Sequence, residues 1–400
     1  MNEINLYGTG ENAARFILTH KDIKISRIIE GKIAGNAEIP DFLGYKVFYL
    51  PDVVSEMRRT YTVIASSYKA YWEIKRRLEK EYHLVEYENF EFFATFQKKR
   101  VFIYGNCHTQ AIRWALQTSS EFNEKYGIYP LPEIQEFDKS YNCGKLWDGI
   151  DDFSFDKCDL FVHQCIQKDN TYGYVYSSNN IISKLNNECK VVGIPNLYRM
   201  PKFLYPQIPD EFEQIYYEPF GDTCYFIFRD KYIDANHEVP MDDLYKMVFD
   251  PSLIDKSEII DRRDEFFSKL EQRDKEWDIH IYHFLENRII SEQCFYEPNH
   301  PTNVVLHYIA KKLLLILGIR EEINLSSMPR LSANEIPIYK SVQQALGLEY
   351  YPSIIRCDGI HKLFPGEMNI REYIRQYLLW NFSNYPHTTK RIQYYRKKRE

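Results

Sequence analysis

The residues with the clearest chemical meaning lie in the segment VFIYGNCHTQAIRWAL, residues 101–116. An apolar run ends at Gly105-Asn106-Cys107 and an amphipathic run begins directly after it, which predicts a strand, a tight turn and a helix. Cys107 then lies at a helix N-terminus, where about half a positive elementary charge favours a thiolate and can bind an anion. A reactive thiol and a buried cysteine beside ordinary capping residues both fit this segment.

Two later segments are predicted to bring polar groups to the same place. CDLFVHQC (158–165) has the pattern of a buried strand that ends at His163 and Gln164, and KVVGIP (190–195) has the pattern of the next strand. Ligands of an open parallel sheet bind outside the carboxyl ends of its strands. We therefore expect Cys107, Gln164 and the turn after KVVGIP to share one edge, whereas His163 is interpreted as a buried core residue.

A third polar segment, Glu297-Pro298-Asn299-His300-Pro301, lies in a predicted loop directly before a predicted helix. Histidine is the side chain that most often moves protons in catalysis. This loop is therefore the candidate source of a base for the predicted edge, although it lies far along the chain from the cysteine.

In order, these segments resemble the motifs of the SGNH hydrolases and acyltransferases. That family has a Gly-Asp-Ser turn that supplies the nucleophile and a late Asp-x-x-His-Pro that supplies the acid and the base. Here the turn ends in Cys107, and the late motif runs from Glu297 to His300 and a proline. The oxyanion-binding Gly-x-Asn-Asp block is absent, and Gln164 is the closest polar substitute at the end of the matching strand.

A closer resemblance is to the WcbI-like family of bacterial capsular polysaccharide biosynthesis enzymes. Its members share Gly-Asn-Cys, a strand that ends in glutamine and a late Asn-His-Pro before a helix. Cys107, Gln164 and His300 match these blocks in order and spacing, over roughly residues 100–350. The family is associated with coenzyme A binding and acyl transfer to a glycan. His108 stands where those relatives commonly have glutamine, so either a second imidazole joins the site or an oxyanion donor is lost.

These resemblances imply a reaction and a role for each residue. His300, which the wider resemblance pairs with Glu297, either keeps Cys107 as a thiolate or activates a sugar hydroxyl. Gln164, Asn106 and N–H groups of the helix stabilise the tetrahedral oxyanion. Acetyl or another acyl group then moves from coenzyme A, with or without a covalent intermediate on the thiol. The further candidate contacts to coenzyme A are Gly105, His108, Arg113, Arg199 and Lys202.

Residues 2–98 read as alternating strands and helices. The first turn holds Gly8 and Gly10 in a G-x-G-x-x-A pattern, and Glu30 ends the second expected strand. The pattern is typical of nucleotide binding, but a tight turn and close helix packing need the same glycines. The segment resembles the short Rossmann-like module that precedes the catalytic part of some sugar-modifying acyltransferases, where it binds a nucleotide-sugar or is only a scaffold. The expected strands are 4–8, 25–31, 46–50, 62–66 and 83–87, and the expected helices are 11–20 and 69–82.

The fold class that follows is α/β. We expect a Rossmann-like domain at 1–98 and, after the polar QKKR, an SGNH-like domain with a parallel sheet at 99–400. From about residue 240 the apolar spacing is helical, with one long run at 257–289 and a later helix that Gly318 ends. We expect this helical region to cap the sheet.

The 400 residues are 44% hydrophobic and 27% charged, with a net charge of −6 and a pI near 6.1. This composition indicates a soluble globular protein without a general attraction to nucleic acid. We find neither a signal peptide pattern nor the roughly 18 apolar residues of a membrane span, and we expect a cytoplasmic location.

The eight cysteines lack zinc-site spacing and are interpreted as reduced thiols. The basic tail at 390–400 either contacts an anionic membrane surface or a polyanionic glycan, or is a solvated end.

Two other functions remain open from the sequence. A thiol-dependent esterase would use the same nucleophile, base and oxyanion groups, and would differ in letting water reach the acyl group. A protein without catalysis would bind coenzyme A or a nucleotide as a sensor or as an assembly scaffold.

Overall fold

The structure is a computed structural model with a mixed α/β fold of parallel sheets and many helices. Its residues group into two compact units. The first contains Met1–Ile194, Trp277–Ile279 and Ala310–Ser326, and the second contains Pro195–Glu276, His280–Ile309 and Ser327–Glu400. The residues that the structure describes are 3–31, 40–137, 149–170, 172–197, 201–208, 215–217, 225–227, 230–236, 239–324, 329–332, 335–352, 354–357 and 366–384.

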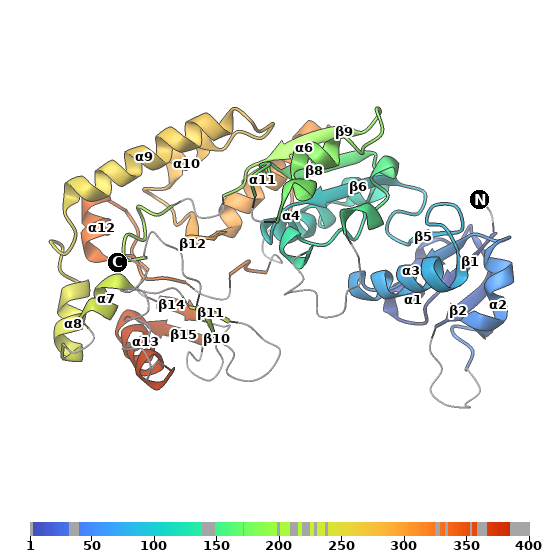
Figure 1. Ribbon diagram of the computed structural model, residues 1–400, viewed down its shortest axis with the longest axis horizontal. Helices are drawn as coiled ribbons and strands as arrows, with labels where there is room; N and C mark the ends of the chain where they lie inside the picture. The colour runs from blue at the N-terminus through green and yellow to red at the C-terminus, as the bar shows by residue number, and fades with distance from the viewer. Residues whose placement is uncertain are drawn as a thin grey trace. The chain divides into compact units, whose positions relative to one another are not determined.

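A five-stranded sheet forms the N-terminal part of the first unit, which is drawn in blue in Figure 1. Its strand order is β3-β2-β1-β4-β5, with all neighbours parallel. Its elements are β1 (Glu3–Tyr7), α1 (Glu11–Thr19), β2 (Lys24–Glu30), β3 (Val47–Tyr49), α2 (Leu50–Met57), β4 (Thr62–Ile64), α3 (Tyr68–Tyr82) and β5 (Phe90–Phe92). Successive strand residues face opposite sides. Leu6 packs in one apolar core with Phe16 of α1. Tyr7 packs in a second core with Val53 of α2 and Tyr71 of α3, so helices cover both faces of the sheet.

One expected strand of this part is wrong. We expected a strand at 83–87, but the fifth strand lies further along the chain, in β5. Asn89 Oδ1 accepts a hydrogen bond from the Val85 N–H at 2.8 Å, and the Asn89 N–H donates to the Val85 carbonyl at 2.8 Å. Tyr87 within this turn has a φ of 66°. The local hydrogen bonds of an asparagine therefore override the β propensity of the segment.

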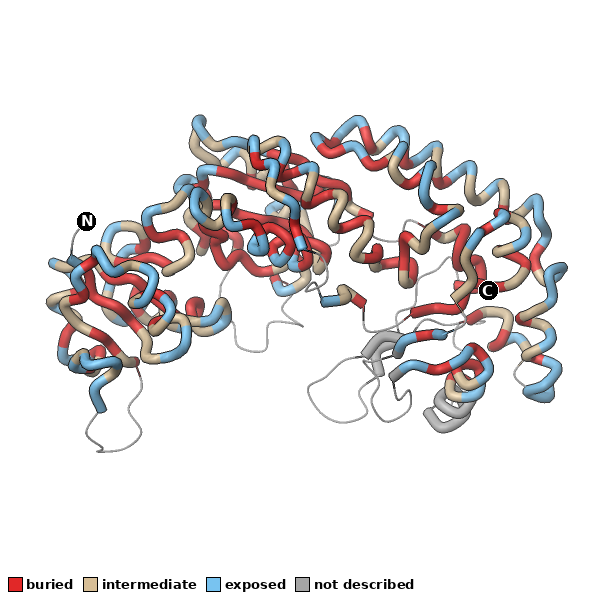
Figure 2. Tube along the Cα trace, turned by 180° about the vertical axis from the view of Figure 1, so that it is seen from behind, coloured by how far each residue is buried: buried red, intermediate tan, exposed pale blue. Residues whose placement is uncertain are grey.

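A four-stranded parallel sheet forms the other part of the first unit, in the order β7-β6-β8-β9. Its strands are β6 (Lys99–Tyr104), β7 (Tyr126–Ile128), β8 (Leu160–Gln164) and β9 (Lys190–Ile194). The helices between them are α4 (His108–Gln117), α5 (Ser120–Lys125) and α6 (Ser178–Ile182), with short 3-10 helices at Ile134–Phe137, Ile150–Asp152, Phe155–Lys157 and Tyr174–Tyr176. Every residue of β8 is buried. The other strands of this sheet are also buried along much of their length (Figure 2). Tyr104 pairs with His163 and Gln164 with Ile194, so β6, β8 and β9 end at one edge.

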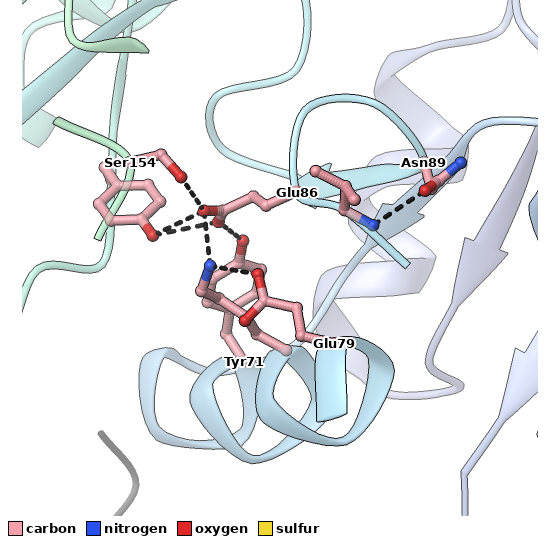
Figure 3. A network of polar contacts seen from close by, with 8 residues as sticks. Tyr71, Glu79, Glu86, Asn89 and Ser154 are labelled. Carbon is pink, nitrogen blue, oxygen red and sulfur yellow. Dashed lines mark hydrogen bonds and ion pairs between the residues drawn. The ribbon is translucent and has the colours of Figure 1, made fainter. Parts of the chain in front are cut away.

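A buried network of polar side chains joins the two sheets of the first unit (Figure 3). The Glu86 carboxylate accepts from Lys75 Nζ of α3 at 2.8 Å and from the Tyr129 hydroxyl at 3.0 Å. Ser154 donates to it at 3.1 Å, and the Tyr71 hydroxyl also donates to it. Lys75 and Glu86 are almost fully buried, so each charge depends on the other. Both sheets belong to one compact unit. The domain boundary that we expect after residue 98 therefore stays a prediction.

Helices and short antiparallel strand pairs follow residue 200. The helices are α7 (Lys231–Ala235), α8 (Met241–Val248), α9 (Lys256–Asp274), α10 (Tyr282–Arg288), α11 (Asn303–Ile316), α12 (Lys340–Leu346) and α13 (Ile370–Asn384). The strand pairs are β10 (Ile215–Tyr217) with β11 (Tyr225–Ile227), β12 (Phe295–Glu297) with β13 (His300–Pro301), and β14 (Ile354–Cys357) with β15 (Gly366–Asn369). No helix in the described part of the chain is long and apolar enough to cross a membrane.

The single helical run that we expected at 257–289 is wrong, because α9 ends at Asp274 and α10 begins only at Tyr282. Asp274 Oδ1 accepts from the Ile281 N–H at 2.6 Å, so a side chain replaces the helical hydrogen bond at the break. The expected helix end at Gly318 is confirmed, with a φ of 78°.

Asp230 is a buried carboxylate whose ionisation opposes folding. Burial raises the pKa of Asp230 to about 7, although the N–H groups of Tyr232 and Ile233 donate to it at the start of α7. When the pKa of a carboxyl is higher in the folded chain than in the unfolded chain, the folded protein becomes less stable as the pH rises from the lower to the higher of these two pKa values. We expect the free energy of unfolding to fall by on the order of 3 kcal/mol between pH 4 and pH 7. Chemical denaturation should show that Asp230→Asn removes this fall.

Asp255→Asn is the control for Asp230→Asn. Asp255 caps α9 from an exposed position, and its hydrogen bonds with Ser257 lower the pKa of its carboxyl. The Asp255 carboxylate therefore stabilises the folded protein at neutral pH, and this contribution is lost as the pH falls. The effect is opposite in sign to that of Asp230. A wild-type stability that rises throughout pH 4 to 7, unchanged by Asp230→Asn, would contradict the prediction.

Candidate active site

Cys107 lies at the start of α4, where we predicted the turn between a strand and a helix. Its side chain is half-buried, and Gly105 before it has a φ of 157°. Asn106 Oδ1 accepts from the His108 N–H at 3.0 Å, and the Asn106 carbonyl accepts from the Thr109 N–H at 2.9 Å. Asn106 therefore caps the helix, and the thiol stands at the positive end of α4.

Gln164 is a buried amide that attaches this turn to the end of β8. Its Oε1 accepts from the Asn106 N–H at 2.8 Å, and its Nε2 donates to His108 Nδ1 at 3.2 Å. A Cβ on Gly105 would lie 2.3 Å from Gln164 Oε1, so only glycine permits this approach. The strand that ends in glutamine and the turn that holds the thiol are therefore one hydrogen-bonded structure.

The two amide contacts of Gln164 determine the tautomer of His108. Because Gln164 Oε1 faces the Asn106 N–H, the amide turns its NH₂ toward His108 Nδ1, which must then accept. The neutral imidazole consequently carries its proton on Nε2, whereas a protonated ring would present a donor to the NH₂. The ring is buried beside the turn. The structure thus places the His108 ring beside Gln164, and which of the two interpretations of His108 applies stays a prediction.

Several N–H groups that we expected to bind an oxyanion are already hydrogen bonded. The N–H of Asn106 donates to Gln164, and the N–H groups of His108 and Thr109 donate to Asn106. The Gln110 N–H donates to the carbonyl of the cysteine at 3.1 Å. The start of α4 therefore acts on the thiol mainly through its electric field, and Gln164 holds the turn in place.

Arg113 was a candidate contact to the phosphates of coenzyme A, but it is buried inside the first unit. Its Nη2 donates to the Ile103 and Leu131 carbonyls at 2.9 and 2.6 Å. Burial lowers the pKa of this guanidinium, which still stays charged at neutral pH. Arg113 ties β6 to the loop after β7, and this burial argues against a phosphate contact.

Glu297 and His300 form a second candidate group, on the strand pair β12–β13 of the second unit. His300 Nδ1 is hydrogen bonded to Glu297 Oε1, and Glu297 Oε2 accepts from the Asn299 N–H at 2.6 Å. The Glu297 side chain is 1% exposed and that of His300 is 23% exposed. The buried carboxylate orients the ring, so the neutral imidazole has its proton-accepting atom at Nε2.

Gly8, Gly10 and Glu30 come together at the first turn of the N-terminal sheet. Gly8 has a φ of 117°, and a Cβ there would lie 2.8 Å from the Ala65 carbonyl oxygen. Thr9 Oγ1 donates to Glu30 Oε2 at 2.9 Å, so the glycine turn contacts the acidic end of β2. Gly10 precedes α1, with open space where a Cβ would be.

The two remaining basic candidates are not placed with the Cys107 turn. Arg199 lies outside the described residues, and Lys202 is a half-buried residue of the second unit. The basic tail at 390–400 also lies outside the described residues.

Thr109 is a residue of the site that we did not predict. It is buried, its hydroxyl donates to the Asn106 carbonyl at 2.8 Å, and its methyl group lies against the Gly105 turn. A threonine three positions after an asparagine, in the first turn of a predicted helix, is a spacing at which such local contacts form. That spacing was the signal available in the sequence.

Gly105→Ala is expected to disrupt the turn. The new methyl group would overlap Gln164 Oε1, and overpacking of a buried site costs about 1–3 kcal/mol. We expect a loss of that order in the free energy of unfolding, together with a changed rate of Cys107 alkylation by iodoacetamide. Gly149→Ala is the matched control, since nothing lies within 4 Å of a Cβ there. Equal denaturation midpoints for the two variants would contradict the prediction.

The fold and the site define an α/β protein with a parallel sheet, in which a strand, a turn and a helix present a cysteine. Residues 100–322 match the family described as the polysaccharide biosynthesis enzyme WcbI, a range that includes Cys107, Gln164 and His300. This range is more than half of the chain. The chain therefore belongs to the WcbI family of polysaccharide biosynthesis enzymes.

A solved structure has a similar fold. It is described as native WcbI, a polysaccharide biosynthesis enzyme, without a disulfide bond between coenzyme A and one of its cysteines. The two chains are 15% identical with a TM-score of 0.56, and the match covers 72% of this chain and 91% of that one. At this identity the likeness concerns the fold alone. A comparison with curated proteins gives no match.

Proposed function

We propose that this protein transfers an acyl group, most simply acetyl, from coenzyme A to a sugar during bacterial capsular or surface polysaccharide biosynthesis. The observation that carries the proposal is the Cys107 thiol, half-buried at the positive end of α4 in a turn that Gln164 holds. Membership of a polysaccharide biosynthesis family supports a sugar acceptor. The coenzyme A in the description of the solved WcbI structure supports the donor.

The proposed donor, an acyl thioester of coenzyme A, supplies an activated carbonyl. The Cys107 sulfur attacks this carbonyl, the bond from the carbonyl to the sulfur of coenzyme A breaks, and the departing thiolate takes up the proton that Cys107 releases. A sugar hydroxyl then attacks the acyl-cysteine. The motif order of the family assigns the base of this step to His300, whose ring Glu297 orients: its Nε2 takes the hydroxyl proton, and the Cys107 sulfur leaves and regains a proton.

Gln164→Ala is expected to lower turnover by about 10²–10³, the effect of losing one group that stabilises an oxyanion or aligns its donors. The Asn106 N–H and His108 Nδ1 both lose their partner in this variant. Gln164→Glu keeps an acceptor for the Asn106 N–H but removes the donor to His108. Comparing its turnover with that of Gln164→Ala therefore shows which of the two contacts turnover depends on. Steady-state kinetics with calorimetry should show nearly unchanged coenzyme A affinity. An equal loss of affinity would make Gln164 a contact to coenzyme A.

We also propose that residues 1–98 are a Rossmann-like module for a nucleotide or nucleotide-sugar and that the remainder is SGNH-like. The order β3-β2-β1-β4-β5 is the one that doubly wound nucleotide-binding sheets use, which supports the first assignment. The contact between Thr9 and Glu30 supports it as well, because it brings the glycine turn to an acidic residue.

Calorimetric titration of coenzyme A and acetyl-coenzyme A into the wild type and Cys107→Ala tests the proposed donor. Micromolar binding that survives the substitution supports acyl transfer and directs the search to sugar acceptors. Failure of both ligands to bind would favour a thiol-dependent esterase, to be assayed with ester substrates. Binding together with unchanged glycan modification in Cys107→Ser and His300→Ala would identify a non-catalytic coenzyme A or nucleotide-binding protein.

A further inference from the structure

Two thiols of the first unit lie at the amino ends of neighbouring strands, whereas Cys107 lies at the carboxyl edge of the same sheet. Cys158 is two positions before β8, and Cys189 directly precedes β9. β8 and β9 are parallel neighbours, and their first residues, Leu160 and Lys190, are register partners. The two cysteines therefore flank one end of a strand pair and take no part in the reaction proposed above.

Hydrogen bonds join the two segments that carry these cysteines. Asn186 Nδ2 donates to the Cys158 carbonyl at 2.7 Å, and the Cys189 N–H donates to the Asn186 carbonyl at 3.1 Å. The Lys190 N–H donates to the Asp159 carbonyl at 3.0 Å. Neighbouring strands lie about 4.8 Å apart and each residue advances about 3.3 Å, so an offset of one residue places the two cysteine Cα atoms about 6 Å apart. Disulfides join Cα atoms that are about 4.4–6.8 Å apart.

The two side chains are hydrogen bonded to each other, and their surroundings make them chemically different. Cys158 is buried in the apolar core, and Cys189 is a half-buried residue packed against that core. Burial raises the pKa of the Cys158 thiol, whereas the hydrogen bond with Cys158 lowers the pKa of the Cys189 thiol. Cys189 is thus the more accessible and more readily ionised thiol, and Cys158 is held in contact with it.

We propose that Cys158 and Cys189 are a redox-active pair that exchanges with the disulfides of small thiols, such as oxidised glutathione. The Cys189 thiolate attacks one sulfur of the small disulfide, the bond between its two sulfurs breaks, and the departing thiolate takes up the proton that Cys189 has released. The Cys158 sulfur then attacks the Cys189 sulfur. The mixed disulfide breaks, and the Cys158 proton leaves on the second small thiol. One small disulfide is thereby reduced to two thiols for each Cys158–Cys189 bond that forms.

The new bond would close the segment from 158 to 189, which contains all of β8 and α6. A cross-link of this kind stabilises a protein by restricting its unfolded chain. The oxidised protein is therefore expected to unfold at a higher temperature than the reduced protein. The exchange is independent of the proposed acyl transfer, because it takes place at the other end of the strands from Cys107 and the reduced pair leaves that reaction unchanged.

Incubation of the full chain with oxidised glutathione, followed by non-reducing trypsin digestion and mass spectrometry, tests the pair. Trypsin releases Cys158 in the peptide 158–168 and Cys189 in the peptide 185–190. The wild type is expected to yield these two peptides joined, with the loss of two hydrogen atoms. Dithiothreitol should separate them again and return the thermal midpoint to that of the reduced protein.

Three variants identify the order of the steps. Cys158→Ala should retain one glutathione on Cys189, because no second thiol displaces it. Cys189→Ala should leave Cys158 unmodified, because that thiol is buried. Cys165→Ser is the matched control, because Cys165 is a half-buried thiol in the same tryptic peptide as Cys158, and this variant should give the joined peptides as the wild type does.

Glutathione that stays on Cys189 of the wild type without joined peptides would overturn the proposal. Loss of the joined peptides in Cys165→Ser would also overturn it, since Cys165 would then be the partner of Cys189. A third contrary result is a wild type whose Cys158 and Cys189 stay unmodified while Cys107 takes up glutathione. The digest of the wild type needs no variant, so the test holds even where Cys158→Ala fails to fold.

Discussion

Cys107→Ala is expected to abolish acyl transfer while the fold and coenzyme A binding persist. Removal of a catalytic nucleophile lowers kcat on the order of 10⁴-fold or more. The hydrogen bonds that hold the turn to β8 are made by Asn106, His108 and Gln164, so the turn should survive loss of the thiol. Release of the coenzyme A thiol from acetyl-coenzyme A measures the rate, and circular dichroism checks the fold.

Cys189→Ala is the matched control for Cys107→Ala. Cys189 is a half-buried thiol of the same unit whose sulfur donates to the Lys190 carbonyl, and its loss should leave the rate unchanged. Mass spectrometry of the wild type with acetyl-coenzyme A should find one acetyl group on Cys107. A Cys107→Ala rate within about ten-fold of the wild type would contradict the covalent route and favour direct transfer promoted by His300.

His300→Gln is expected to lower kcat/KM by about 10²–10⁴, the usual effect of losing a general base. Glu297→Gln should lower it less, because the amide still accepts a hydrogen bond from the ring but no longer carries the charge that stabilises the imidazolium. The double variant should be no slower than His300→Gln alone, because the carboxylate acts only through the imidazole. Fully additive losses would show that Glu297 has a separate role.

The surface pair of His283 and Glu286 gives a matched control for the pair of Glu297 and His300. His283 Nδ1 lies 3.1 Å from Glu286 Oε2, with the same three-residue spacing. The His283 side chain is 85% exposed, however, against 23% for His300. His283→Gln should therefore leave kcat/KM unchanged. A similar fall in both histidine variants would mean that the assay reports stability and not catalysis.

Much of the site could be predicted from short segments. The run of apolar residues before Gly105, and the amphipathic run after Cys107, predicted the strand, turn and helix that the structure contains. The prediction that β6, β8 and β9 end at one edge was also correct, because neighbouring parallel strands bring their carboxyl ends together. Local periodicity was misleading where a side chain replaced a backbone hydrogen bond, as Asp274 does between α9 and α10.

The roles of single side chains were harder to predict. The role of Gln164 in stabilising an oxyanion stays a prediction, and the sequence did not predict that its amide also bonds the Asn106 N–H and His108. Arg113 was a candidate contact to coenzyme A, yet it is buried and donates to carbonyl groups. Burial and the choice among hydrogen-bond partners depend on residues that are distant in sequence, which a local pattern does not report.

The order of the chemical groups along the chain, and most of the elements that hold them, could be read from local patterns, because helix, strand and turn preferences act over a few residues. Which of these groups meet depends on how the elements pack. Gln164 lies 58 positions from Asn106 and still bonds its N–H, and Ser154 lies 68 positions from Glu86 and donates to its carboxylate. Such contacts form when whole elements pack, since packing sets which donors and acceptors lose water and must find each other.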